Sequence, residues 1–71
     1  MTNRVLSIAG SDPSGGAGIQ ADLKTIAAHQ IYGMAIPTLI TVQNSMGIVR
    51  VELLSAEIVA QQLENILIDI P

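Results

Sequence analysis

The sequence contains no cysteine, tryptophan or phenylalanine, and Tyr32 is its one aromatic residue. The absence of cysteine excludes disulfides and thiolate zinc sites as a means of holding a small fold together. Because aromatic rings are so scarce, the core must be built from isoleucine, leucine, valine and alanine. With 71 residues, the chain amounts to one small domain at most.

Positive charge is also scarce. Arg4, Lys24 and Arg50 are the only lysines and arginines, they are scattered along the chain, and the formal net charge is −3. Nucleic-acid binding through phosphate neutralisation is therefore not expected. No apolar run approaches membrane-spanning length, and the apolar stretch before Ser11 is too short for a secretory signal. These absences predict a cytoplasmic protein with neither nucleic acid nor membrane as a partner.

The first half of the chain predicts a strand, a loop, a helix and a second strand. Residues 4–9 form a compact apolar run, which is typical of a buried strand. Residues 17–30 carry apolar side chains at helical spacing, and residues 36–42 are apolar and rich in β-branched side chains. Since proline cannot donate to a strand ladder, Pro37 predicts that pairing begins at Thr38.

The second half predicts another strand and a second helix. Apolar and charged side chains alternate over residues 49–53, which indicates a strand with one wet face. Ser55 is placed as a helix N-cap, with Glu57 in the first turn. The apolar stripe of this helix comprises Val59, Leu63, Ile66, Leu67 and Ile70.

The order strand–helix–strand–strand–helix is typical of an α/β sheet with a right-handed crossover. So few strands cannot cover two helices and also satisfy their own edges. We therefore expect residues 1–71 to be an incomplete domain, with the strand at 38–42 exposed along one edge.

A glycine-rich stretch between the first strand and the first helix predicts a ligand-binding loop. Gly15, Gly16 and Gly18 allow close approach of a ligand and positive φ without a Cβ clash. The helix that follows offers free N–H donors at its start.

Two phosphate-loop interpretations compete for this stretch. Gly10 and Gly15 have the spacing of a Walker A loop, but Gly16 and Ala17 follow where lysine and a hydroxyl residue are required. Residues 16–21 fit the glycine pattern of a dinucleotide-binding βαβ unit, yet no acid ends the second strand to hold a ribose. The dinucleotide unit remains an alternative.

The stretch from Ser7 to Thr25, SIAGSDPSGGAGIQADLKT, resembles the N-terminal motif of the hydroxymethylpyrimidine kinase/phosphomethylpyrimidine kinase family of thiamine biosynthesis. The segments 32–34 (YGM) and 41–45 (TVQNS) follow in the same order and spacing. The resemblance implies a ribokinase-like parallel sheet flanked by helices, of which this chain is the N-terminal portion. It also implies ATP-dependent phosphorylation of 4-amino-5-hydroxymethyl-2-methylpyrimidine and of its monophosphate.

The resemblance assigns roles to individual residues. Gln43 matches the residue that reads the pyrimidine edge, and Asp22 matches the acid near the substrate hydroxymethyl group. Gly10 and Ala17 match small contacts around the pyrimidine. Asp12, which precedes a proline, is a turn residue rather than a metal ligand. No catalytic or metal-binding residue is assigned. The predicted hinge glycines are Gly15, Gly16 and Gly18.

In the family, the sites for ATP and Mg²⁺ and the catalytic residue lie in the C-terminal half. We therefore expect these 71 residues to be inactive alone, and either to form a homo-oligomer or to be completed by a C-terminal part. A non-catalytic pyrimidine-binding module is an alternative, as is a truncated or split product.

Overall fold

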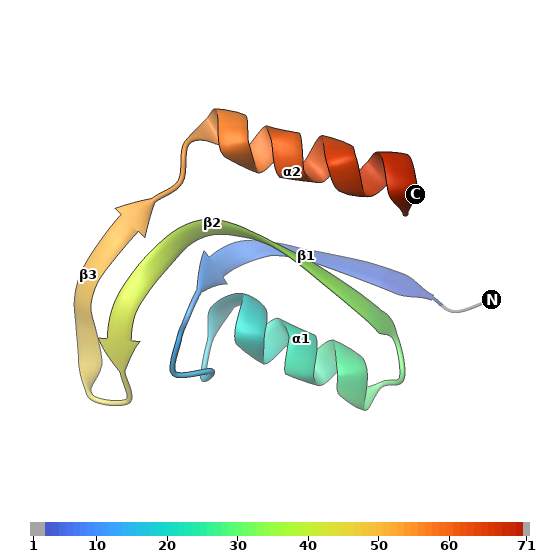
Figure 1. The fold of residues 1–71 in the computed structure, drawn as a ribbon. Helices are drawn as coiled ribbons and strands as arrows, with labels where there is room; N and C mark the ends of the chain where they lie inside the picture. Colours follow the sequence, from blue (N-terminus) through green and yellow to red (C-terminus); the bar gives the residue numbers. More distant parts are fainter. Residues whose placement is uncertain (1–2, 71) are drawn as a thin grey trace.

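The computed structural model describes residues 3–70 and shows one sheet with a helix on each face (Figure 1). The elements follow one another as β1 (Arg4–Ser11), α1 (Gly18–Ala28), β2 (Tyr32–Asn44), β3 (Gly47–Leu53) and α2 (Ala56–Asp69). In the sheet the strands lie in the order β1-β2-β3. The predicted α/β class and the order β-α-β-β-α are confirmed.

β1 and β2 are parallel and are joined by the crossover helix α1. β2 begins at Tyr32, earlier than the predicted start at Ile36, and Pro37 lies inside the ladder opposite Ala9. The prediction that pairing starts at Thr38 is therefore wrong. The strand accommodates the proline because β3 pairs with β2 only from Leu39 onward, so within residues 3–70 Pro37 has a neighbouring strand on one side alone.

The β1–β2 register shifts directly after this proline. Ala9 pairs with Pro37, whereas Ser11 pairs with Ile40, so β2 holds one residue more than β1 across this step. Such a bulge bends a strand and increases its twist. Here it lies just before the carboxyl end of β1, where the glycine-rich loop begins.

β3 returns antiparallel to β2 after a tight turn at Ser45 and Met46. The amide of Met46 donates to the Asn44 side chain at 2.8 Å, which stabilises the turn. β2 is consequently the central strand, and the expected free edge at residues 38–42 is wrong. Within the described part of the chain, β1 and β3 form the edges of the sheet.

The two helices begin differently. The Ser55 side chain accepts a hydrogen bond from the Ile58 amide at 3.2 Å, which confirms the predicted N-cap of α2. α1 is preceded by Ala17, which offers no capping side chain. α1 packs closely on β2 at Gly33, where an added Cβ would lie 3.1 Å from Leu23 and Ile26.

The core of the described structure is small. Ile36 is the one apolar side chain that is fully buried. In the predicted stripe of α2, Leu67 is 52% exposed and the other members are half-buried. Every residue of β3 is exposed. Burial is therefore concentrated where α1 and β2 meet β1.

Candidate functional site

The loop between β1 and α1 is organised around the carboxylate of Asp12, which is only 4% exposed. One carboxylate oxygen accepts from the Ser14 amide at 2.9 Å and from the Ser14 hydroxyl at 2.7 Å. The other accepts from the Gly16 amide at 3.0 Å. The Asp12 carbonyl accepts from the Gly15 amide at 3.0 Å. The loop is therefore held together by hydrogen bonds to its own aspartate.

The Ser14 hydroxyl, followed by the backbone amides of Ser14, Ala17 and Gly16, lowers the pKa of the Asp12 carboxyl below its ordinary value. Desolvation opposes this shift without reversing it. The carboxylate occupies the kind of amide-lined concavity in which a phosphate-binding loop holds phosphate. This occupancy argues against both the Walker A and the dinucleotide interpretations, because their loop amides must be free for the ligand.

Two side chains of α1 complete the loop. The Gln20 side chain accepts from the Asp12 amide and donates to the Ser11 hydroxyl, both at 2.7 Å. Lys24 donates to the Gly15 carbonyl at 3.0 Å. Sequence reasoning did not assign a role to either residue. Their spacing of four on one helix face was the available signal, since it brings both over the same loop.

The three predicted hinge glycines differ in what requires them. Gly15 and Gly18 have positive φ, at 83° and 61°, and a Cβ at Gly18 would lie 2.2 Å from the Gly10 carbonyl oxygen. At Gly16 an added Cβ would meet Asp12 at an ordinary 3.7 Å. Gly10 is packed against Leu39, 2.8 Å from where its Cβ would be. Backbone geometry therefore requires glycine at Gly15 and Gly18, and close packing favours it at Gly10.

Gln43 lies near the carboxyl end of β2 and is tied to the carboxyl end of β1. Its side-chain amide nitrogen donates to the Thr41 hydroxyl at 2.6 Å, and that hydroxyl donates to the Ser11 carbonyl at 2.9 Å. Thr41 is only 8% exposed, so this relay is fixed inside the fold. The chain Gln43–Thr41–Ser11 holds the predicted pyrimidine-reading amide beside the start of the loop.

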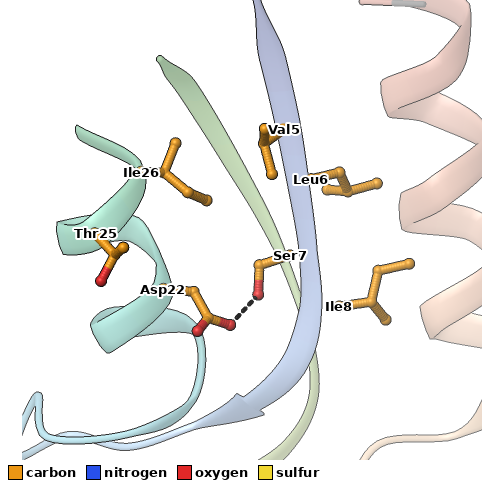
Figure 2. Close-up of a pocket in the computed structure, with 7 residues that line it drawn as sticks. All are labelled: Val5, Leu6, Ser7, Ile8, Asp22, Thr25 and Ile26. Atoms are coloured by element: carbon orange, nitrogen blue, oxygen red, sulfur yellow. Dashed lines mark hydrogen bonds between the residues drawn. The ribbon is translucent and has the colours of Figure 1, made fainter. Parts of the chain in front are cut away.

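Asp22 is exposed on α1 and accepts a hydrogen bond from the Ser7 hydroxyl of β1 at 2.7 Å (Figure 2). Both residues line an open groove of about 380 Å³ along β1, together with apolar side chains and Thr25. In Figure 2, Ser7 points toward α1 whereas Leu6 and Ile8 point to the other side of the strand.

The structure thus places the two predicted polar residues, Gln43 and Asp22, in two separate hydrogen-bonded groups. One contains Gln43, Thr41 and Ser11, and the other contains Asp22 and Ser7. Among residues 3–70 no hydrogen bond joins Gln43 to Asp22. Ala17 is exposed at the start of α1, and its backbone amide is one of the groups that lower the pKa of Asp12. The sequence did not point to the roles of Thr41 and Ser7. The contacts of Thr41 with Ser11 and of Ser7 with Asp22 join residues that are distant along the chain, and Thr41 and Gln43 lie on one face of β2.

Two further observations bear on the site. Across residues 3–70, no three histidine or acidic side chains lie close enough together to hold a metal ion. Neither α1 nor α2 has the length and apolar character that a membrane crossing by a helix requires.

Residues 12–71 match the sequence profile of the family described as phosphomethylpyrimidine kinase. The chain belongs to the phosphomethylpyrimidine kinase family. Among its relatives, the hydroxymethylpyrimidine/phosphomethylpyrimidine kinase of Rhizobium meliloti is 54% identical over 70 residues, covering 99% of this chain and 26% of the relative. The kinase of the same description from Synechococcus elongatus is 52% identical, covering 93% of this chain and 25% of the relative.

Solved structures of this family and of related kinases share the fold. The phosphomethylpyrimidine kinase of Clostridium difficile superposes with a TM-score of 0.93 at 53% identity, over 99% of this chain and 30% of that one. The Staphylococcus aureus pyridoxal kinase in complex with AMP-PCP and pyridoxal superposes with a TM-score of 0.81 at 41% identity. The match covers 92% of this chain and 25% of the pyridoxal kinase. The predicted ribokinase-like class is confirmed. The chain spans about a quarter of the length of the Rhizobium meliloti and Synechococcus elongatus relatives.

Proposed function

We propose that this chain supplies the pyrimidine-binding part of an ATP-dependent kinase of thiamine biosynthesis. Its substrates would be 4-amino-5-hydroxymethyl-2-methylpyrimidine and the corresponding monophosphate. The observation that carries the proposal is the Gln43 amide, held by Thr41 beside the glycine-rich loop. The names of the relatives support the same chemistry.

The chemistry of the Gln43 amide fits an aminopyrimidine edge. Its nitrogen has two hydrogens, and one of them is used by Thr41. The second hydrogen can donate to a ring nitrogen, while the carbonyl oxygen accepts from the neighbouring exocyclic amine. Because Thr41 fixes the plane of the amide, little side-chain entropy remains to be lost when the base binds.

The remaining predicted residues take complementary roles in this proposal. Asp22 accepts a hydrogen bond from the substrate hydroxyl, while Gly10 and Ala17 contact the ring. The loop containing Gly15, Gly16 and Gly18 borders the substrate. Phosphoryl transfer depends on positioning and on neutralising the transferred group. ATP and Mg²⁺ would be bound by the part of the enzyme beyond these residues, in keeping with the nucleotide complexes of the related pyridoxal kinase.

The proposal also includes the cytoplasmic location and the association expected from the sequence, either with a second copy or with a C-terminal part. A non-catalytic pyrimidine-binding module remains the second candidate. Pyridoxal is a further substrate to test, because a structure solved with pyridoxal shares this fold at 41% identity.

The test joins residues 1–71 to the C-terminal part of the Rhizobium meliloti relative, giving a fusion enzyme. We expect the fusion enzyme to release ADP with the pyrimidine alcohol and MgATP, and the 71 residues alone to release none. If the fusion enzyme binds the alcohol but never phosphorylates it, the binding-module candidate is favoured.

Gln43→Leu in the fusion enzyme should weaken binding of the pyrimidine by about 1–3 kcal/mol, because a polar edge of the base is buried without a partner. Gln43→Glu should also bind weakly near neutral pH, since a second acceptor then faces the ring nitrogen. Its binding should recover toward acid pH as the carboxyl takes up a proton. Calorimetry at two pH values measures both effects. The same measurement on the unmodified enzyme corrects for protonation of the pyrimidine itself.

Gln61→Leu is the matched control, because Gln61 is an exposed glutamine on α2 whose side chain, within residues 3–70, donates only to Glu57. If the Gln43→Leu variant, the Gln43→Glu variant and the unmodified enzyme bind alike at both pH values, Gln43 does not read the base.

A further inference from the structure

The face of β1 that meets α1 carries a buried hydroxyl that packing does not require. Ser7 is only 8% exposed, and its hydroxyl donates to Asp22 at 2.7 Å. A serine at such a position costs desolvation unless the hydroxyl is hydrogen-bonded. Asp22 is its hydrogen-bond partner within residues 3–70, so the serine and the aspartate form one unit.

The hydrogen bond uses one oxygen of the Asp22 carboxylate. Oδ2 accepts from Ser7, and within the described structure Oδ1 has no hydrogen-bond partner. Figure 2 shows the carboxylate between α1 and β1, at the groove along the strand. Ser7 fixes the side chain in one orientation, and Oδ1 stays available to a ligand.

We propose that Ser7 is a positioning residue, which holds Asp22 so that its free oxygen accepts a hydrogen bond from the alcohol to be phosphorylated. This inference rests on the proposed function, in which Asp22 meets the substrate hydroxyl. Ser7 itself does not touch the substrate. Without the Ser7 hydroxyl, Asp22 can rotate freely toward solvent, and the alcohol loses a preorganised acceptor.

Substitutions in the fusion enzyme test the proposal. Ser7→Ala should raise the KM for the pyrimidine alcohol about three- to tenfold and change kcat less than twofold, because a hydrogen bond to the bound alcohol is weakened. Ser7→Thr keeps the hydroxyl and should restore most of the affinity. Thr25→Val is the matched control, since Thr25 lines the same groove but its side chain makes no hydrogen bond to Asp22 in the described structure.

A double-mutant cycle with Asp22→Ala separates positioning from a purely structural role. If Ser7 acts through Asp22, Ser7→Ala should add no further rise in KM once Asp22 is replaced by alanine. An equal rise in both backgrounds overturns the proposal, and melting midpoints confirm that each variant is folded. If Asp22→Ala raises KM but Ser7→Ala does not, the inference fails while the proposed function stands. If unmodified fusion enzyme is folded but does not bind the alcohol, both fail.

Discussion

The side of the molecule formed by β1 and α1 differs sharply from the side formed by β3 and α2. On the first side a loop closes on Asp12, and three polar side chains of α1 bond to β1 or to the loop, namely Gln20, Asp22 and Lys24. On the second side every residue of β3 is exposed, and among the described elements α2 contacts only β2. The polar side chains of the loop and of α1 thus have hydrogen-bond partners within the described part of the chain, whereas the β3–α2 side exposes apolar side chains such as Val49 and Ile68.

The largest expected effect concerns the second side. Val49 is 80% exposed and Ile68 is 83% exposed, and Ile36 alone is fully buried among the described apolar side chains. Most domains are stable by about 5–15 kcal/mol, and so small a core cannot supply that. We therefore expect the isolated 71 residues to be marginally stable or to self-associate. Sedimentation at several concentrations measures this, and a monomer with a cooperative melting transition would contradict it.

The next effect concerns the side formed by β1 and α1. Gly18→Ala in the fusion enzyme should destabilise it by about 2–4 kcal/mol, since a left-handed backbone is forced on alanine and the new Cβ overlaps the Gly10 carbonyl. Gly16→Ala is the control within the same loop, and its stability should change by less than about 0.5 kcal/mol. Denaturation midpoints give both values. Equal losses would show that the loop is not held in the described geometry.

A smaller effect should appear as a dependence on pH. The pKa of the Asp12 carboxyl is lowered in the folded state, so its contribution to stability is complete above the ordinary value of 3.8 and is lost as pH falls through the folded pKa. Asp12→Asn in the fusion enzyme should therefore lower the melting midpoint at neutral pH. In acid, the difference in melting midpoint between this variant and the unmodified enzyme should become smaller. Glu64→Gln, at an exposed acid of α2, is the matched control for the removal of one negative charge. A constant gap between Asp12→Asn and unmodified enzyme would contradict this assignment.

Local patterns in the sequence predict the elements and the class of the fold. Ser55 indicates the start of α2, and the glycine-rich stretch indicates the loop, because caps and turns depend on residues close in sequence. The limits of β2 were mispredicted, since Pro37 is tolerated only because β3 starts to pair after it. The sequence indicates no more than a turn residue at Asp12, and its contacts with Ser14 and Gly16 show the larger part it plays in shaping the loop.

The resemblance to the family pointed to Gln43 and Asp22, and the structure adds what holds them. The link from Ser7 to Asp22 spans 15 positions, and that from Thr41 to Ser11 spans 30. No periodicity within a single element encodes such pairs. They depend on the parallel alignment of β1 with β2 and on the way α1 returns along β1.

The bulge in β2 also governs where the chain can change length. Ser7 pairs with Ala35 before the bulge and Ser11 pairs with Ile40 after it. β2 therefore contains one additional residue at the bulge, while the parts of β2 on either side of it stay in register with β1. A one-residue deletion at Thr38 or Leu39 would straighten the ladder and leave both flanks facing as they do now. The same deletion between Ile40 and Gln43 would turn the Gln43 amide to the opposite face of the sheet. Gaps among natural relatives should therefore be tolerated at the first position and excluded at the second, although the two are only a few residues apart.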